Sequence, residues 1–174
     1  SKDIINSHGL LKEELREPKT YFNILHAIAQ GNTRVTDIAN KCGLDSKDIP
    51  IYLNLLVNLE IVKKENPVTE RKAKTKKSLY FINDNFFRFW FRFIFPNKSN
   101  IEGGYTNNVM KLIRNGFNSY VGYSFEDICR SLIVEKPSLL PFSLNKIGRW
   151  WGDYRDGTEK KAVEIDIIGL NEDT

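Results

Sequence analysis

The sequence lacks any long apolar run, and this absence limits the class of protein it can encode. A membrane-spanning helix needs about 20 consecutive apolar residues. The longest candidate, residues 86–95, has only ten residues and includes Arg88 and Arg92. The first nineteen residues are polar and amphipathic, unlike a secretory signal peptide. We therefore expect a cytoplasmic protein with no membrane partner.

Cysteine and histidine are also scarce. The two cysteines, Cys42 and Cys129, fall on apolar faces of predicted helices, so a disulfide framework is not expected. The two histidines, His8 and His26, are isolated, and no Cys/His spacing typical of a zinc site occurs. The P-loop motif GxxxxGK[ST] does not occur either, so nucleotide binding cannot be assigned to these residues. We expect this chain to hold no cofactor of its own.

Charge is unevenly distributed along the chain. Residues 1–101 hold 17 Lys and Arg against 11 Asp and Glu, whereas residues 102–174 hold 9 against 11. A basic first part and a slightly acidic second part indicate two modules with different partners. The chain begins with Ser1 and ends directly after a predicted strand, which suggests a fragment of a longer protein.

Three helical patterns follow one another from the N-terminus. Residues 2–16 carry a loose apolar stripe, so we predict an N-terminal helix within residues 1–17. Residues 19–31 predict a second helix, and residues 33–43 predict a third with Thr33 as its N-cap. The side chains expected to face inward from the last two helices are Tyr21, Ile24, Leu25, Ile28, Val35, Ile38, Ala39 and Cys42.

A further helix begins within the sequence DSKDIP, where Asp and Ser are expected to cap it and Pro50 is tolerated in the first turn. A short glycine-containing turn separates it from the preceding helix, which is the spacing of a helix-turn-helix motif. The side chains expected to face inward are Tyr52, Leu55, Leu56 and Leu59. Those expected on the outward face are Lys47, Asp48, Ile51, Asn54 and Asn58.

Two predicted strands, residues 60–65 and 78–83, flank a basic loop and complete a winged helix-turn-helix domain over residues 18–83. The loop carries five positive charges in seven residues: Arg71, Lys72, Lys74, Lys76 and Lys77. Such a loop beside a helix-turn-helix can neutralise the phosphates of duplex DNA. A lysine-rich loop is also a common solvated surface with no partner, so this reading has a simpler alternative.

The predicted recognition helix offers few groups for reading bases. Asn54 or Asn58 can contact adenine and Lys47 lies at the groove, but no arginine is present for guanine. Asp45 and Asp48 fall near the end where phosphates would lie. We therefore expect mainly backbone contact with double-stranded DNA and weak sequence preference, or a winged helix used for protein docking.

An aromatic segment follows the second strand. Seven of the ten residues from Phe86 to Phe95 are aromatic. We predict a connecting helix over residues 84–96, capped by Asp84 and ended by Pro96. A helix that is apolar nearly all round is typically buried between two layers. Base stacking by exposed aromatics is the alternative, but exposing so much apolar area is disfavoured at about 25 cal/mol per Å².

The remaining residues predict a second module after a linker over residues 97–104. Two helices are expected over residues 109–121 and 123–133, followed by strands over residues 146–152 and 161–169. The turn DYRDGTE joins the strands. On the second strand Val163, Ile165 and Ile167 face one side, and Glu164 and Asp166 face the other. A helix with an acid, followed by a hairpin with an acid on its second strand, resembles the opening of a metal-dependent nuclease fold.

Four blocks of sequence carry a resemblance to a known architecture: IYLNLLVNLEIVKKENPV, SLYFINDNFFRFWFRFIFPN, GYSFEDICRSLI and EIDIIGLNED. They resemble the C-terminal region of archaeal and bacterial AAA-type ATPases, in which a P-loop ATPase domain precedes a winged helix and a domain related to PD-(D/E)XK nucleases. The resemblance covers essentially the whole chain. It implies that residues 1–17 are a linker from a missing ATPase domain and that residues 105–174 are a truncated nuclease-like domain. ATP and Mg²⁺ are implied for the parent protein only.

The resemblance also implies site residues in the second module. Glu126 matches the acid on the first helix of the nuclease-like domain, and Asp166 matches its metal-binding aspartate. The following strand with Glu-x-Lys would begin where this sequence stops, so two carboxylates without the lysine make a poor catalyst. Glu126 can instead form an i,i+4 pair with Arg130, and Asp166 can be an ordinary polar strand residue.

Together these patterns predict an α+β chain in which a winged-helix domain is joined by an aromatic helix to an incomplete nuclease-like α/β domain. The function expected is a DNA-binding or DNA-associated module of an AAA-type ATPase. Its partners would be double-stranded DNA and its own N-terminal ATPase domain, with a second copy as a further partner. The alternatives are a fragment of a metal-dependent nuclease and a docking or dimerisation module that does not bind DNA.

Overall fold

The computed structural model describes residues 17–71 and 75–171, and these form an α+β chain. In the described residues, helices account for most of the regular structure, and two separate two-stranded sheets are formed by β1–β2 and β3–β4. Contacts divide the chain into two compact units. Unit 1 comprises the described residues up to Lys63 and Tyr80–Val109, and unit 2 comprises Lys64–Leu79 and the described residues from Met110.

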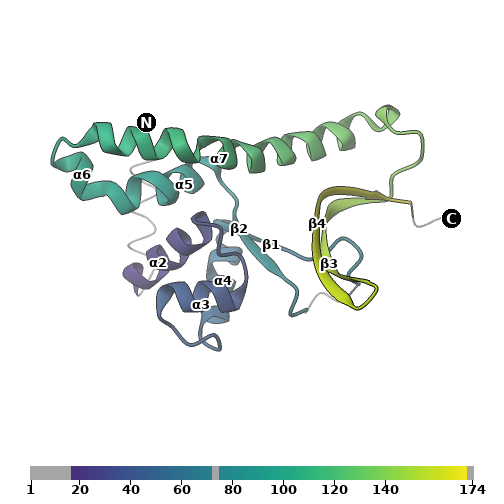
Figure 1. Ribbon diagram of the computed structural model, residues 1–174, viewed down its shortest axis with the longest axis horizontal. Coiled ribbons are helices and arrows are strands. Elements are labelled where there is room, and N and C mark those ends of the chain that lie inside the picture. The colour runs from purple at the N-terminus through teal and green to yellow at the C-terminus, as the bar shows by residue number, and fades with distance from the viewer. Residues whose placement is uncertain (1–16, 72–74, 172–174) are drawn as a thin grey trace. The chain divides into compact units, whose positions relative to one another are not determined.

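Unit 1 contains three helices, α2 (Pro18–Ala29), α3 (Val35–Cys42) and α4 (Ile49–Asn58); Figure 1 shows these helices together. Gly43 ends α3 in the left-handed conformation, with φ of 67°, which a residue without Cβ adopts at little cost. The amide of Leu44 then donates to the carbonyl of Ala39 at 3.0 Å, which closes the turn.

The helix starts differ from the sequence-based expectation. Thr33 is not the N-cap of α3: Arg34 occupies that position, and the Thr33 carbonyl instead accepts from the amide of Tyr80 at 2.9 Å. Asp48 occupies the N-cap position of α4, but its side chain makes no capping hydrogen bond. Pro50 lies in the first turn of α4, as predicted.

The core of unit 1 is built from the apolar faces of these helices. The predicted residues of α2 are buried, whereas α4 buries Ile49 and Leu53 in addition to Leu56. Tyr52, Leu55 and Leu59, which were expected to face inward, are half-buried and pack against this core. The helical face of α4 is thus rotated slightly from the predicted one.

The strands β1 (Val62–Glu65) and β2 (Leu79–Ile82) are shorter than predicted. Glu60 has a positive φ of 57°, a backbone conformation that a strand does not contain, so the extended segment starts only after it. The amide of Asn83 donates to the carbonyl of Ile61 at 2.8 Å. Each strand runs from one unit into the other, since the division falls within β1 and between the first two residues of β2.

The aromatic segment is not one regular helix. It consists of α5 (Asn85–Phe89), a π-helix η1 (Trp90–Ile94) and a 3-10 turn η2 (Phe95–Asn97), and it continues into α6 (Lys98–Glu102). Asp84 caps α5, accepting from the Phe87 amide at 2.9 Å, as predicted. Pro96 does not end the segment, and the predicted linker over residues 97–104 is largely helical, because a proline is accommodated in the first turn of a new helical segment.

Most of this segment is buried or half-buried, as predicted, and Phe86 is the exception among its aromatic residues. Phe91 is 1% exposed and belongs to the core that α2, α3 and α4 form, whereas Phe86 is 41% exposed. Arg88 is buried and donates to the side chain of Asn85. Two carbonyls of the π-helix form hydrogen bonds with side chains of α2. The carbonyl of Phe91 lies 2.8 Å from His26 Nδ1, and the carbonyl of Arg92 accepts from Gln30 Nε2 at 3.1 Å.

Unit 2 contains most of α7 (Thr106–Glu135), one continuous helix where two were predicted. A short 3-10 turn η3 (Pro137–Leu139) follows. The strands β3 (Lys146–Asp156) and β4 (Glu159–Leu170) are longer than predicted and pair antiparallel through a tight turn at Gly157, whose φ is 63°. A register shift lies between Gly148 and Trp150, where β4 has one extra residue.

The contrast between Phe91 and Phe86 gives a test of the core. Phe91→Ala should lower the free energy of unfolding by about 3–5 kcal/mol, since it leaves a cavity in a fully buried site. The matched change Phe86→Ala, on the same segment but 41% exposed, should have a much smaller effect. Urea unfolding followed by circular dichroism measures both, and equal losses would contradict the packing.

Candidate functional site

The outward face of α4 carries exposed polar and apolar side chains in one stripe. Ile51, Asn54 and Asn58 are all exposed, as predicted, and their i, i+3, i+7 spacing places them on one side of the helix. Ile51 is 69% exposed. The stripe therefore offers two amides and one branched apolar group to a partner of unit 1.

Lys47, the cation predicted beside this stripe, is not a free charge. Its Nζ lies 3.1 Å from Asp45 Oδ2, and its backbone amide donates to Asp45 Oδ1 at 3.1 Å. These hydrogen bonds from Lys47, first through the backbone and then through the side chain, lower the pKa of Asp45. The pair is exposed and nearly neutral, so Lys47 adds little to the attraction of a phosphate while Asp45 is ionised.

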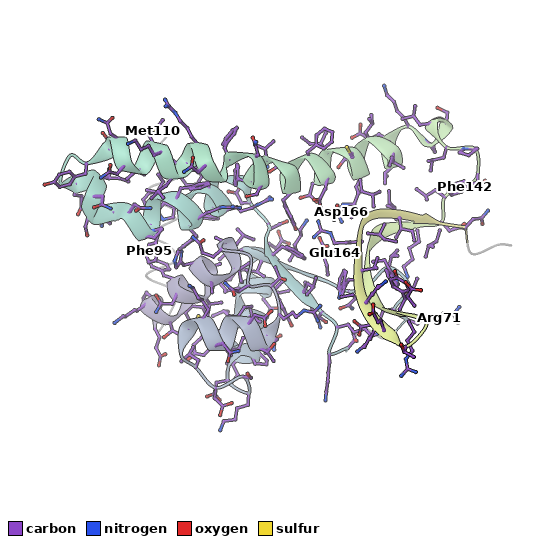
Figure 2. All side chains as sticks on the ribbon, viewed as in Figure 1. Arg71, Phe95, Met110, Phe142, Glu164 and Asp166 are labelled. Carbon is purple, nitrogen blue, oxygen red and sulfur yellow. The ribbon has the colours of Figure 1, made fainter. Side chains whose placement is uncertain are left out.

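The basic loop lies in unit 2, and the structure describes part of it. Arg71 and Lys76 are exposed; Figure 2 labels Arg71. Lys77 Nζ lies 3.8 Å from Glu70 Oε2, which screens part of its charge. Lys72 and Lys74 lie outside the described residues. In the described part of this loop, Arg71 and Lys76 are therefore exposed cations that can meet an anionic partner.

Both arms of this loop are bonded to β3. The Val68 amide donates to the carbonyl of Arg149 at 2.8 Å, and the Trp151 indole N–H donates to the carbonyl of Lys77 at 2.9 Å. Within the loop, Ser78 Oγ donates to Asn66 Oδ1 at 2.7 Å. The loop is therefore anchored at its base by the second hairpin, a contact that the sequence did not predict.

A cluster of charges in unit 2 contains the predicted nuclease-like acids. Arg149 of β3 is 4% exposed, and its guanidinium donates to Glu126 of α7. It also lies 3.9 Å from Glu164 of β4 and 5.0 Å from the centre of the Tyr123 ring. Figure 2 shows Glu164 and Asp166 on β4. Asp166 lies within the segment of β4 that bulges opposite Arg149 and is exposed.

The electrostatics of the cluster are set by burial and by the guanidinium. Burial raises the pKa of Glu126, Arg149 opposes this rise, and the charge of Asp166 adds to it. The pKa of Arg149 is itself raised: burial alone would lower it, but Glu126 and then Glu65 favour the charged form more strongly. The structure thus brings Glu126 and Asp166 close enough to influence each other.

The predicted i,i+4 partner of Glu126 has other contacts. Arg130 bonds Asp127 and lies 3.8 Å from Glu65 of β1, while Glu126 bonds Arg149. Arg149 is the functional residue that sequence reasoning missed. Its position between Gly148 and Trp150 gave no signal, because the carboxylate that it binds lies 23 residues away on α7.

The donor set of this cluster does not fit Mg²⁺. The carboxylate of Glu126 is engaged by Arg149, and a magnesium site needs several oxygen ligands in near-octahedral geometry. Among the residues that the structure describes, no group of three or more His, Cys, Asp and Glu side chains is placed to hold a metal ion. The guanidinium of Arg149 supplies positive charge to Glu126 and Glu164, which gives these two acids a structural role.

A pocket of about 280 Å³ lies beside the cluster, within unit 2. Its lining includes Glu65, Glu70, Arg130, Lys146 and Arg149. Carboxylates and cations thus share this pocket, which gives it no strong preference for ligand charge.

None of the helices among the described residues has the length and apolar character that a membrane span requires.

Removing the charge of Arg149 should destabilise unit 2. We expect Arg149→Met to lower the free energy of unfolding by about 3–5 kcal/mol, because it leaves Glu126 partly buried without its partner. The control is Lys160→Met, which breaks the exposed pair with Asp153 and should cost far less. Urea unfolding of both variants decides the point, and a loss no larger than that of the control would refute it.

The same variant should change how Glu126 titrates. Because burial raises the pKa of Glu126, the proton stabilises the fold below the ordinary pKa of a glutamate, and this contribution is lost as pH rises through the folded pKa. Arg149 opposes the rise, so Arg149→Met should raise the pKa of Glu126 further. Carbon-detected NMR of the side-chain carboxyl measures this; an unchanged or lower pKa would be inconsistent with the ion pair, and Lys160→Met should leave it unaltered.

Comparison with known proteins gives two matches and one absence. Residues 90–174 match the DUF234 family, described as archaeal and bacterial proteins of unknown function. The chain is 41% identical over 165 residues to the uncharacterized protein MJECL04 of Methanocaldococcus jannaschii, a match that covers 94% of this chain. It spans 35% of that relative's length. No solved structure matches the chain significantly. The matches therefore indicate an archaeal and bacterial relationship and assign no activity.

Proposed function

We propose that this chain is the winged-helix, DNA-binding module of an AAA-type ATPase and acts mainly through contacts with the phosphate backbone of double-stranded DNA. The observation that carries the proposal is the exposed stripe on α4, the second helix of a helix-turn-helix. In such motifs this helix enters the major groove. The buried faces of α2, α3 and α4 leave the stripe free for a partner.

The basic loop supports the same function independently. Arg71 and Lys76 are exposed, and Lys72 and Lys74 add two charges to the same sequence segment. Exposed cations bind phosphate with a strength that depends on released counterions, not on base sequence. This loop supplies the affinity, and the nearly neutral α4 face supplies little of it.

The ATPase part of the proposal rests on the resemblance of four sequence blocks and on the length of the relative. The match covers 35% of that relative, which leaves room there for a further domain. ATP and Mg²⁺ would be held by that domain in the parent protein, which we place in the cytoplasm. The partners proposed for this chain are DNA and its own ATPase domain.

Protein docking is the second candidate function, and one observation favours it. The surface of α7 carries an apolar stripe in the described part of unit 2, with Ile128 63% exposed. Its residues are Met110, Phe117, Val121, Phe125, Ile128 and Leu132. Exposed apolar stripes of this size commonly mark protein contacts. A metal-dependent nuclease is not favoured by the donor set around Arg149.

Salt-titrated DNA binding tests the proposal. Replacing Lys72, Lys74, Lys76 and Lys77 by Ala should flatten the slope of log K against log salt by up to about 3–4, since each lost phosphate contact removes about 0.9. The control replaces four other exposed lysines, Lys98, Lys111, Lys136 and Lys160, which removes the same charge. Fluorescence anisotropy with a labelled duplex gives both slopes.

The outcome separates the two candidate functions. Equal slopes in the two sets of variants would remove the basic loop from the interface. No binding by the wild-type chain at low salt, together with self-association that Ile128→Lys abolishes in light scattering, would favour docking. Ile128→Lys should leave DNA binding unchanged if the proposed function is correct.

A further inference from the structure

The chemistry of the α4 stripe fits one kind of base pair. An asparagine amide both donates and accepts, which matches the N6 donor and N7 acceptor of adenine in the major groove. A branched apolar side chain matches the methyl group of thymine. Resting on the proposed function, we propose that Asn54, Asn58 and Ile51 read A·T base pairs in the major groove of duplex DNA.

The exposure of Ile51 supports this reading. At 69% it is the most exposed large hydrophobic side chain in the described part of the chain, although the core of unit 1 lies directly behind α4. Ile49 and Leu53, two positions to either side, are completely buried. Contact with the methyl group of thymine would remove apolar surface of this isoleucine from water, while the two neighbouring amides bind adenine.

The groups that read guanine are missing from the stripe. Guanine presents two acceptors, which arginine or lysine binds. The nearest cation that sequence analysis placed at the groove, Lys47, is engaged by Asp45 at 3.1 Å. Asp48 is exposed at the start of α4 and repels phosphates. The stripe therefore contributes selectivity for A·T and little affinity.

The length of the stripe sets the size of the site. From Ile51 to Asn58 the helix rises about 10 Å, at 1.5 Å per residue. Base pairs of duplex DNA are stacked about 3.4 Å apart. Three side chains distributed over this rise can contact about three successive base pairs.

The experiment compares the binding of this chain to two DNA duplexes of equal length. One duplex contains interspersed A·T pairs without runs of adenine, and the other contains G·C pairs at the same positions. Fluorescence anisotropy at constant salt should show at least about fivefold tighter binding of the A·T duplex by the wild-type chain. Substituting 7-deazaadenine, which lacks N7, or uracil, which lacks the methyl group, should each weaken wild-type binding.

The variants assign these losses to residues. Asn54→Ala and Asn58→Ala should reduce the preference and remove sensitivity to 7-deazaadenine, while Ile51→Ala should remove sensitivity to uracil. Asn23→Ala, at an exposed asparagine of α2, is the matched control and should change neither. All four side chains are exposed, so we expect each variant to keep the folded state, which circular dichroism checks.

Two failures are distinguishable. Equal affinity for the A·T and G·C duplexes, with no effect of the modified bases, overturns this inference while the proposed function stands. No binding to either duplex at low salt overturns the proposed function and the inference with it. The modified bases are tested on the wild-type chain, so the result does not depend on any variant.

Discussion

The organisation of unit 2 depends on the ion pair between the buried guanidinium of Arg149 and Glu126. The side chain of Arg149 joins β3 to α7 through Glu126 and approaches β4 at Glu164. Its carbonyl accepts from Val68, so the same residue also holds one arm of the basic loop. Burying a charge is costly unless its partners are in place. The helix, the hairpin and the loop base must therefore be correctly placed together.

Unit 1 is organised differently, around apolar packing and a few carbonyl groups. Phe91 joins the aromatic segment to the core of the three helices. At this point the backbone is a π-helix and lacks the regular hydrogen bonds of an α-helix. The carbonyls of Phe91 and Arg92 are used by His26 and Gln30 of α2 instead. A π-helix is uncommon in isolation, and these two side-chain contacts offset its irregular hydrogen bonding.

Much of the fold followed from local patterns, because helical spacing, glycine and proline report directly on backbone geometry. The apolar stripe of α2, Gly43 and the Asp84 cap are of this kind. The errors arose where distant residues decide the outcome. Thr33 lost its predicted role because β2, far along the chain, uses its carbonyl. The two helices predicted over residues 109–121 and 123–133 are one helix, since the glycine between them, Gly122, costs a helix only about 1 kcal/mol.

The candidate sites divide in the same way. Exposure of Asn54, Asn58, Arg71 and Lys76 could be predicted, since an outward helical face and a polar loop are local features. The sequence could not predict the acidic partners of Lys47 and Lys77 or the position of Arg149 among the acids. Each of these depends on which carboxylate the fold brings near the cation.

A division of chemical roles follows from these charges. The α4 stripe has no net charge of its own and lies beside the acidic Asp48, so it cannot draw a polyanion from solution. The exposed cations of the basic loop can, but contacts to phosphates carry no sequence information. Affinity and selectivity would thus come from separate segments of the chain. In the proposed complex with DNA, a helix that attracts phosphates only weakly would have an advantage. It would contribute only where its amides and its isoleucine find matching groups, and it would add nothing to binding elsewhere.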